Sequence, residues 1–148
     1  MTNFGIAALL SMLLSVQTWQ PDFESAKKMA AEKHQLLLLN FSGSDWCGPC
    51  IRMHKEIFGS DDFSKMADTT LVLYNADFPR NKKNQLPVAL KKQNEKLADK
   101  YNPEGNFPLT VLLNEKGEVV KSWIGMPEGT SVQFASTIKS LSEQLHSK

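Results

Sequence analysis

Short apolar runs alternate along the chain with longer stretches in which apolar residues recur every three or four positions. Two nearly continuous apolar runs, at residues 36–41 and 71–74, are typical of strands buried on both faces of a sheet. Two more runs, 109–113 and 118–123, flank the sequence Asn-Glu-Lys-Gly, which favours a hairpin. Apolar residues at helical spacing predict four helices, which cover residues 22–34, 47–58, 88–101 and 130–145.

The order of these elements predicts an α/β fold. Strands that alternate with helices favour parallel pairs in a central sheet, and the closing hairpin adds an antiparallel pair. We therefore expect a mixed sheet of four to five strands flanked by helices. The 148 residues are enough for one such domain. The order of elements by itself says nothing about chemistry.

The first residues follow a different pattern. Residues 4–16 form an apolar, uncharged run that is too short to span a bilayer as a helix, which needs about 20 residues. Its length suits the apolar region of a secretory signal peptide, although no Lys or Arg precedes it. We predict a signal peptide at 1–18, a folded domain at 19–148 and a periplasmic or secreted protein. The alternative is that the run forms the first helix of a cytoplasmic domain.

Charge and cysteine content exclude several classes of protein. The net charge of +1 gives no overall field that would attract nucleic acid or an anionic membrane. The basic residues between Arg80 and Lys96 are interpreted as a solvated loop and helix face, with an acidic partner as the alternative. The chain has only two cysteines, which lie three positions apart. Two are too few for a disulfide scaffold or a four-cysteine zinc site.

The cysteine pair is the candidate reactive group. Cys47 and Cys50 lie between a predicted buried strand and a predicted helix. Unpaired N–H groups at a helix start stabilise a thiolate, so we expect Cys47 to be the nucleophile. Cys50, one turn later, can close a disulfide with it and resolve a mixed disulfide. Pro49 is tolerated in a first helical turn, where a missing N–H costs little.

The motif Trp46-Cys47-Gly48-Pro49-Cys50 resembles the active site of the thioredoxin family. The resemblance implies the thioredoxin fold, and it implies a cis proline at Pro108 that faces the cysteines and shapes a substrate groove beside Phe107. It extends over about residues 19–145 and is nearest to small, single-domain, exported bacterial proteins of this family. The segments that carry this narrower similarity are residues 40–47, 77–80 and 92–95, with Trp19 and Tyr101.

The sequence also departs from the family pattern. Ordinary thioredoxins have a buried Asp before the motif, paired with a buried Lys on the next strand. Here the matching positions are Asn40 and Leu73, so both halves of the pair are missing together. We expect proton transfer at Cys50 to use water, or Asp45 if that side chain turns inward. Leu109, where Thr is commoner, alters the rim of the groove.

The predicted function is reduction of protein disulfides. The Gly-Pro dipeptide between the cysteines is also found in thioredoxin, whose reduction potential is about −270 mV. The resemblance implies a membrane-bound or soluble thiol donor of electrons, no cofactor beyond the Cys47–Cys50 disulfide, no metal and a monomer. The alternatives are a disulfide oxidase or isomerase, and a non-catalytic binding or metal-carrier module. A metal carrier would use Cys50, Met53 and His54, although an exposed His54 on the helix is the more ordinary interpretation.

Overall fold

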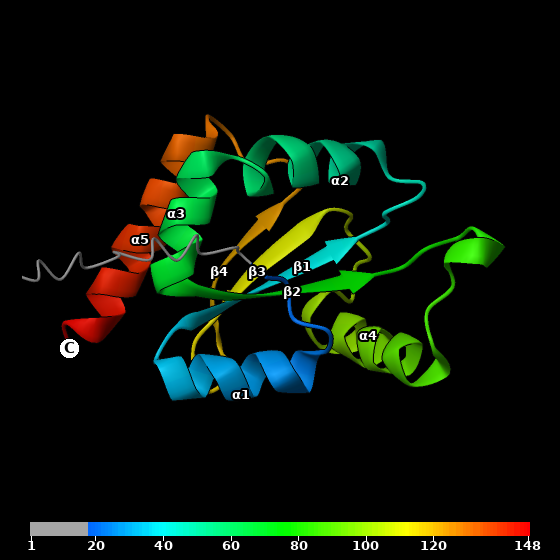
Figure 1. Ribbon diagram of the computed structural model, residues 1–148, viewed down its shortest axis with the longest axis horizontal. Helices are drawn as coiled ribbons and strands as arrows, with labels where there is room; N and C mark the ends of the chain where they lie inside the picture. Colours follow the sequence, from blue (N-terminus) through cyan, green and yellow to red (C-terminus); the bar gives the residue numbers. More distant parts are fainter. Residues whose placement is uncertain (1–17) are drawn as a thin grey trace, which may run out of the picture.

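The computed structural model describes residues 18–148, which form a four-stranded sheet with helices on both faces (Figure 1). The predicted signal peptide at 1–18 falls almost entirely outside these residues. The strands are β1 (Leu36–Ser42), β2 (Leu71–Asp77), β3 (Leu109–Leu113) and β4 (Val119–Ile124). The α-helices are α1 (Phe23–Lys33), α2 (Gly48–Met53), α3 (Asp61–Thr70), α4 (Val88–Tyr101) and α5 (Ser131–His146). A π-helix, η1 (His54–Phe58), continues α2, and a short 3₁₀-helix, η2 (Lys82–Asn84), precedes α4.

The sheet is mixed, as the sequence predicted. Its strand order is β2-β1-β3-β4, with β1 and β2 parallel and the other two pairs antiparallel. The parallel pair runs from Leu36 opposite Leu71 to Ser42 opposite Asp77. Strands β1 and β2 therefore end at the same edge of the sheet, and the cysteine motif follows β1 at that edge.

Alternate residues of β1 face two separate apolar clusters. Leu36 and Leu38 pack with α3, α5 and η1, whereas Leu37 and Leu39 pack with α1 and α4. Figure 1 shows the same division, with α2, α3 and α5 on one face and α1 and α4 on the other. Burial on both faces explains why β1 has a continuous apolar run instead of an alternating pattern.

The structure adds one helix that the sequence analysis did not predict. Helix α3 begins after Ser60, whose hydroxyl accepts a hydrogen bond from the Phe63 N–H at 3.2 Å. Phe63, Met66 and Ala67 form its buried face, at helical spacing. The helix predicted over 47–58 is also interrupted, because it changes from α to π geometry at His54.

The predicted ends of other elements are close to the observed ones. Strand β2 continues three residues past the predicted Tyr74, because Asn75 to Asp77 still pair with β1. Thr130 and Gln133 form the expected capping box at the start of α5. Between residues 18 and 148, no helix combines the length and apolar character needed to cross a membrane.

Candidate active site

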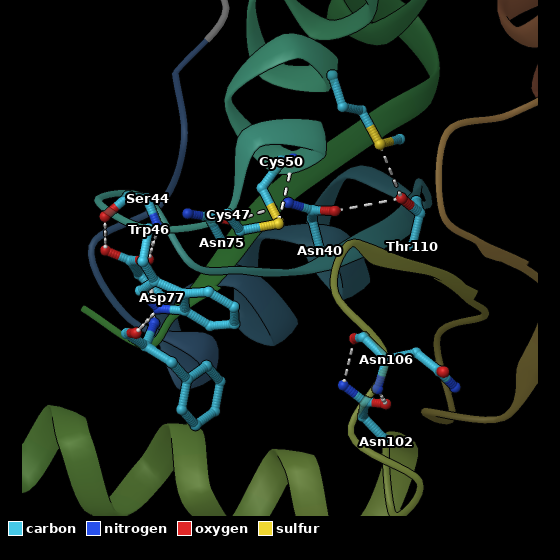
Figure 2. Close-up of a disulfide and its surroundings, with 12 residues drawn as sticks. Asn40, Ser44, Trp46, Cys47, Cys50, Asn75, Asp77, Asn102, Asn106 and Thr110 are labelled. Atoms are coloured by element: carbon cyan, nitrogen blue, oxygen red, sulfur yellow. Dashed lines mark hydrogen bonds between the residues drawn. A yellow bond between two sulfur atoms is a disulfide. The ribbon is translucent and has the colours of Figure 1, made fainter. Parts of the chain in front are cut away.

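The two cysteines form a disulfide at the start of α2 (Figure 2). Cys47 is the N-cap residue, and its sulfur accepts a hydrogen bond from the Cys50 N–H at 3.3 Å. Pro49 lies in the first turn, where its missing N–H leaves no helical bond unmade. Gly48 begins the helix, and its α-carbon faces open space. Both cysteines are buried, with Cys47 5% and Cys50 3% exposed.

The Trp46 side chain is fixed by contacts on several sides. Its indole N–H donates to the Phe78 carbonyl oxygen at 2.7 Å. The Arg80 guanidinium lies 3.7 Å from the centre of a Trp46 ring, and Phe107 contacts the indole edge-on at 5.4 Å between centroids. Trp46 therefore lies between a cation and an aromatic ring, next to Cys47.

Asp45 is directed away from the disulfide. Its carboxylate accepts hydrogen bonds from the Arg80 and Asn81 N–H groups, both at 2.9 Å, and from the Asn84 side-chain amide at 3.0 Å. The Arg80 N–H, followed by the other donors, lowers the pKa of this carboxyl. The suggestion that Asp45 turns inward to serve Cys50 is therefore wrong. The carboxylate instead fixes the loop that presents Arg80.

A second carboxylate stabilises the loop before the motif. Asp77, at the end of β2, accepts hydrogen bonds from the Ser44 N–H at 2.9 Å and from its hydroxyl (Figure 2). Because β1 and β2 end side by side, this contact connects the cysteine loop to the neighbouring strand. No local pattern predicts this role for Asp77, which was singled out only by the family resemblance.

The predicted groove residues lie beside the cysteine loop. The peptide bond between Phe107 and Pro108 is cis. Phe107 contacts both Trp46 and Phe78, the latter at 5.5 Å between ring centroids. The turn before Phe107 is closed by paired hydrogen bonds between the Asn102 side chain and the backbone of Asn106, each 2.8 Å long. Figure 2 shows the two asparagines joined by these hydrogen bonds.

Behind the disulfide lies a neutral polar network. The Asn40 amide donates to Asn75 Oδ1 at 2.9 Å, and the Thr110 hydroxyl donates to Asn40 Oδ1 at 3.2 Å (Figure 2). The same hydroxyl contacts the buried Met53 sulfur at 3.9 Å. Leu73, which takes the position of the buried Lys of ordinary thioredoxins, lies in the apolar core. Since the network satisfies the Asn40 amide on both sides, it needs no ionised group.

A pocket of about 280 Å³ opens next to Cys50 on this side. It is lined by Ser42, Ser44, Cys50, Ile51, His54, Lys55 and Asn75. His54 is an exposed residue of the helix, as predicted, although one side of its ring packs against Trp19 at 5.4 Å and Phe58 at 6.0 Å between centroids. Partial burial lowers the pKa of His54, partly opposed by the negative charge of Asp77. Among residues 18–148, no three His, Cys, Asp or Glu side chains converge into a possible metal site.

Comparison with known families decides what this arrangement belongs to. A profile described as "Thioredoxin-like domain" matches residues 23–140, which is most of the chain. The protein belongs to the thioredoxin-like domain family. The matched range spans all four strands, the two cysteines and Pro108, and the thioredoxin fold predicted from sequence is confirmed.

Two relatives of this thioredoxin-like protein come from Chlamydia pneumoniae. It is 30% identical over 122 residues to "Disulfide bond reductase DsbH", a match that covers 82% of this chain and 70% of DsbH. It is 29% identical over 98 residues to "Thioredoxin-related protein DsbJ", covering 66% of this chain but only 27% of DsbJ. A solved structure named "DsbH Oxidoreductase" superposes with a TM-score of 0.79 at 25% identity, over 96% of this chain and 95% of that one. With its Cys-X-X-Cys disulfide, this thioredoxin-like protein is a thiol–disulfide oxidoreductase.

Proposed function

We propose that the protein reduces disulfides in other proteins, with Cys47 as the nucleophile and Cys50 as the resolving thiol. The observation that carries this proposal is the position of Cys47 at the start of α2, where its sulfur accepts the Cys50 N–H. The same N–H would stabilise a thiolate on Cys47 in the reduced protein.

The exchange proceeds in two steps. The Cys47 thiolate attacks one sulfur of the substrate disulfide, forms a mixed disulfide and releases the other substrate sulfur as a thiolate. Cys50 then attacks Cys47, which forms the intramolecular disulfide and releases the second substrate thiol. Cys50 is one helical turn from Cys47, and their Cα atoms are 5.2 Å apart, so the second step needs little movement.

The residues around Cys47 support binding of an extended substrate segment. Trp46, Phe107 and the cis Pro108 lie on one side of the motif, and Arg80 covers the outer face of the indole. Apolar rings with a cation over one face suit a partly unfolded protein chain, so we assign Phe107 and Pro108 to the substrate groove and Trp46 to its support.

Two observations support reduction as the direction of the reaction. The dipeptide Gly48-Pro49 between the cysteines is the one found in thioredoxin, a reductant. The relative DsbH is named a disulfide bond reductase. The apolar run at residues 4–16 supports export of the protein to the periplasm or the medium, and electrons would then come from a membrane-bound or soluble thiol donor.

The reduction potential of the Cys47–Cys50 pair tests the direction. The protein is equilibrated in glutathione or dithiothreitol buffers, and the fraction oxidised is measured. A reduction potential of about −270 mV supports the proposed reductase activity, whereas a potential of about −120 mV would identify an oxidase that inserts disulfides. Cys47→Ser provides the second test, since a non-catalytic binding module would keep its partners without this thiol, whereas a reductase loses all turnover.

A further inference from the structure

The mechanism above leaves the Cys50 proton without an acceptor. Cys50 is 3% exposed, so bulk hydroxide has little access to its thiol. The side chains in contact behind the disulfide, Asn40, Asn75 and Thr110, form a neutral hydrogen-bond network that cannot take a proton. Asp45 is engaged by the loop at residues 80–84 and does not turn inward.

His54 is the histidine that shares a pocket with Cys50. The two residues are four positions apart on one continuous helical segment, in which the backbone N–H of His54 donates to the carbonyl oxygens of Cys50 and Ile51. Residues at this spacing lie on the same helix face. Both side chains line the pocket of about 280 Å³, together with the polar side chains of Ser42 and Asn75. A pocket of this size has room for a water between the imidazole and the thiol, and the Ser42 and Asn75 side chains offer that water further polar partners.

We propose that His54 accepts the proton of the Cys50 thiol, through water in this pocket, as Cys50 attacks the mixed disulfide. This inference rests on the proposed exchange through Cys47 and Cys50. In the step, the bond between the two sulfurs of the cysteine pair forms and the bond from Cys47 to the substrate sulfur breaks. The electron pair leaves on the substrate thiolate, and the Cys50 proton moves to the neutral imidazole.

The charges around His54 are compatible with this role. Burial of the ring favours the neutral form, which is the form that can accept a proton. Asp77, at the end of β2, acts in the opposite direction and stabilises the imidazolium once it forms. Lys55 is the other charged side chain lining the pocket. Trp19 and Phe58, which pack against the ring, carry no charge.

The resolving step can be followed by itself with 5,5′-dithiobis(2-nitrobenzoate). The reduced protein releases one thionitrobenzoate when Cys47 attacks, at a rate that depends on reagent concentration. It releases a second thionitrobenzoate when Cys50 resolves the mixed disulfide, at a rate that is independent of reagent concentration.

This second phase is measured by stopped flow from pH 5.5 to 9 for the wild type, His54→Gln and His54→Phe. His54→Gln and His54→Phe remove the base, and Phe retains an aromatic ring against Trp19 and Phe58. His34→Gln is the matched control, because its exposed ring contacts Glu115 instead of Cys50.

We expect the wild-type second phase to stay level from pH 8 down to the pKa of His54. In both His54 variants it should fall about tenfold for each pH unit below the thiol pKa, and be about 10- to 100-fold slower at pH 6.5. His34→Gln should follow the wild type. Second-phase profiles that superimpose in all four proteins would overturn the role of His54 and leave the proposed function intact. A wild type that releases only one thionitrobenzoate would instead overturn resolution by Cys50, and both proposals with it.

Discussion

The indole ring of Trp46 packs directly against the α-carbon of Gly43, with no space between them for a β-carbon. The turn that brings them together is closed by the Cys47 N–H, which donates to the Gly43 carbonyl oxygen at 2.9 Å. A glycine before the cysteine motif is therefore required by a close approach, and the indole it admits is the one that borders Cys47.

Gly43→Ala should displace Trp46 from its hydrogen bond with the Phe78 carbonyl oxygen. Crowding of this kind costs about 1–3 kcal/mol, so we expect a fall of that size in the free energy of unfolding. The Trp46 indole N–H should also lose protection from hydrogen exchange, measured by NMR. Gly48→Ala is the matched control, because a β-carbon there meets no atom within 4 Å. Unchanged protection in Gly43→Ala would show that the ring has another place to pack.

Local patterns predicted the sheet and the cysteine helix because their causes are local. The apolar run of β1 and the capping box of α5 are set by residues close in sequence, and both are confirmed. Helix α3 was missed although its signals, Ser60 and the buried face around Phe63, are visible in the sequence.

The surroundings of the cysteines were harder to predict because they depend on contacts between distant residues. Asp45 finds its partners 35 to 39 positions later, and Asn40 finds one of its partners 70 positions later. The contact of the His54 ring with Trp19 was also missed, because Trp19 lies 35 positions earlier and is held there by an isolated bridge to Leu73 in β2. Motifs thus identify the reactive sulfurs, whereas the groups that control them follow from the fold.

Asp45→Ala should release the loop at residues 80–84. The Arg80 and Asn81 amides lose their acceptor, so we expect their hydrogen exchange to accelerate about tenfold or more. Because the pKa of Asp45 is lowered in the folded protein, the loop contact is present above the ordinary carboxyl pKa. It is lost as the pH falls through the lowered value. Wild-type protection should therefore decline in acid, and the variant should show no such decline; equal exchange in the two proteins at neutral pH would contradict the assignment.

Tyr74→Phe should destabilise the face of the sheet under α4. The buried Tyr74 hydroxyl donates to Asn94 Oδ1 and accepts from the Gln93 amide at 2.8 Å, so its removal leaves two polar groups without a partner. We expect a loss of about 1–3 kcal/mol at neutral pH, measured by urea unfolding. Tyr101→Phe, which removes one bond to the Gly117 carbonyl oxygen from a half-buried ring, should cost less.

The same pair of proteins should differ in alkali. Burial raises the pKa of Tyr74 to about 12, whereas a tyrosine in the unfolded chain has a pKa of about 10. The unfolded state therefore releases the proton first, and wild-type stability should decline between these two values. Tyr74→Phe lacks this contribution, so the gap between the two proteins should narrow as the pH rises. A gap of constant size would contradict the raised pKa.

Asn40→Asp tests whether the network behind Cys50 is neutral by necessity. A protonated Asp can donate to Asn75 and accept from Thr110, which are the two bonds that Asn40 makes. An ionised Asp would be buried at 2% exposure with the Asn75 oxygen facing it, so its folded pKa must lie above that of the unfolded chain. A carboxyl with a raised pKa lowers stability as the pH rises from its unfolded pKa to its folded pKa.

Urea unfolding of Asn40→Asp should therefore show a small loss of unfolding free energy at pH 4 and a loss of about 3 kcal/mol at pH 8. Asn40→Ala, which breaks the same bonds without adding a charge, should lose an equal amount at both pH values. An Asn40→Asp loss that is also equal at both would mean that the Asn75 amide reverses to donate and that the site accepts a carboxylate.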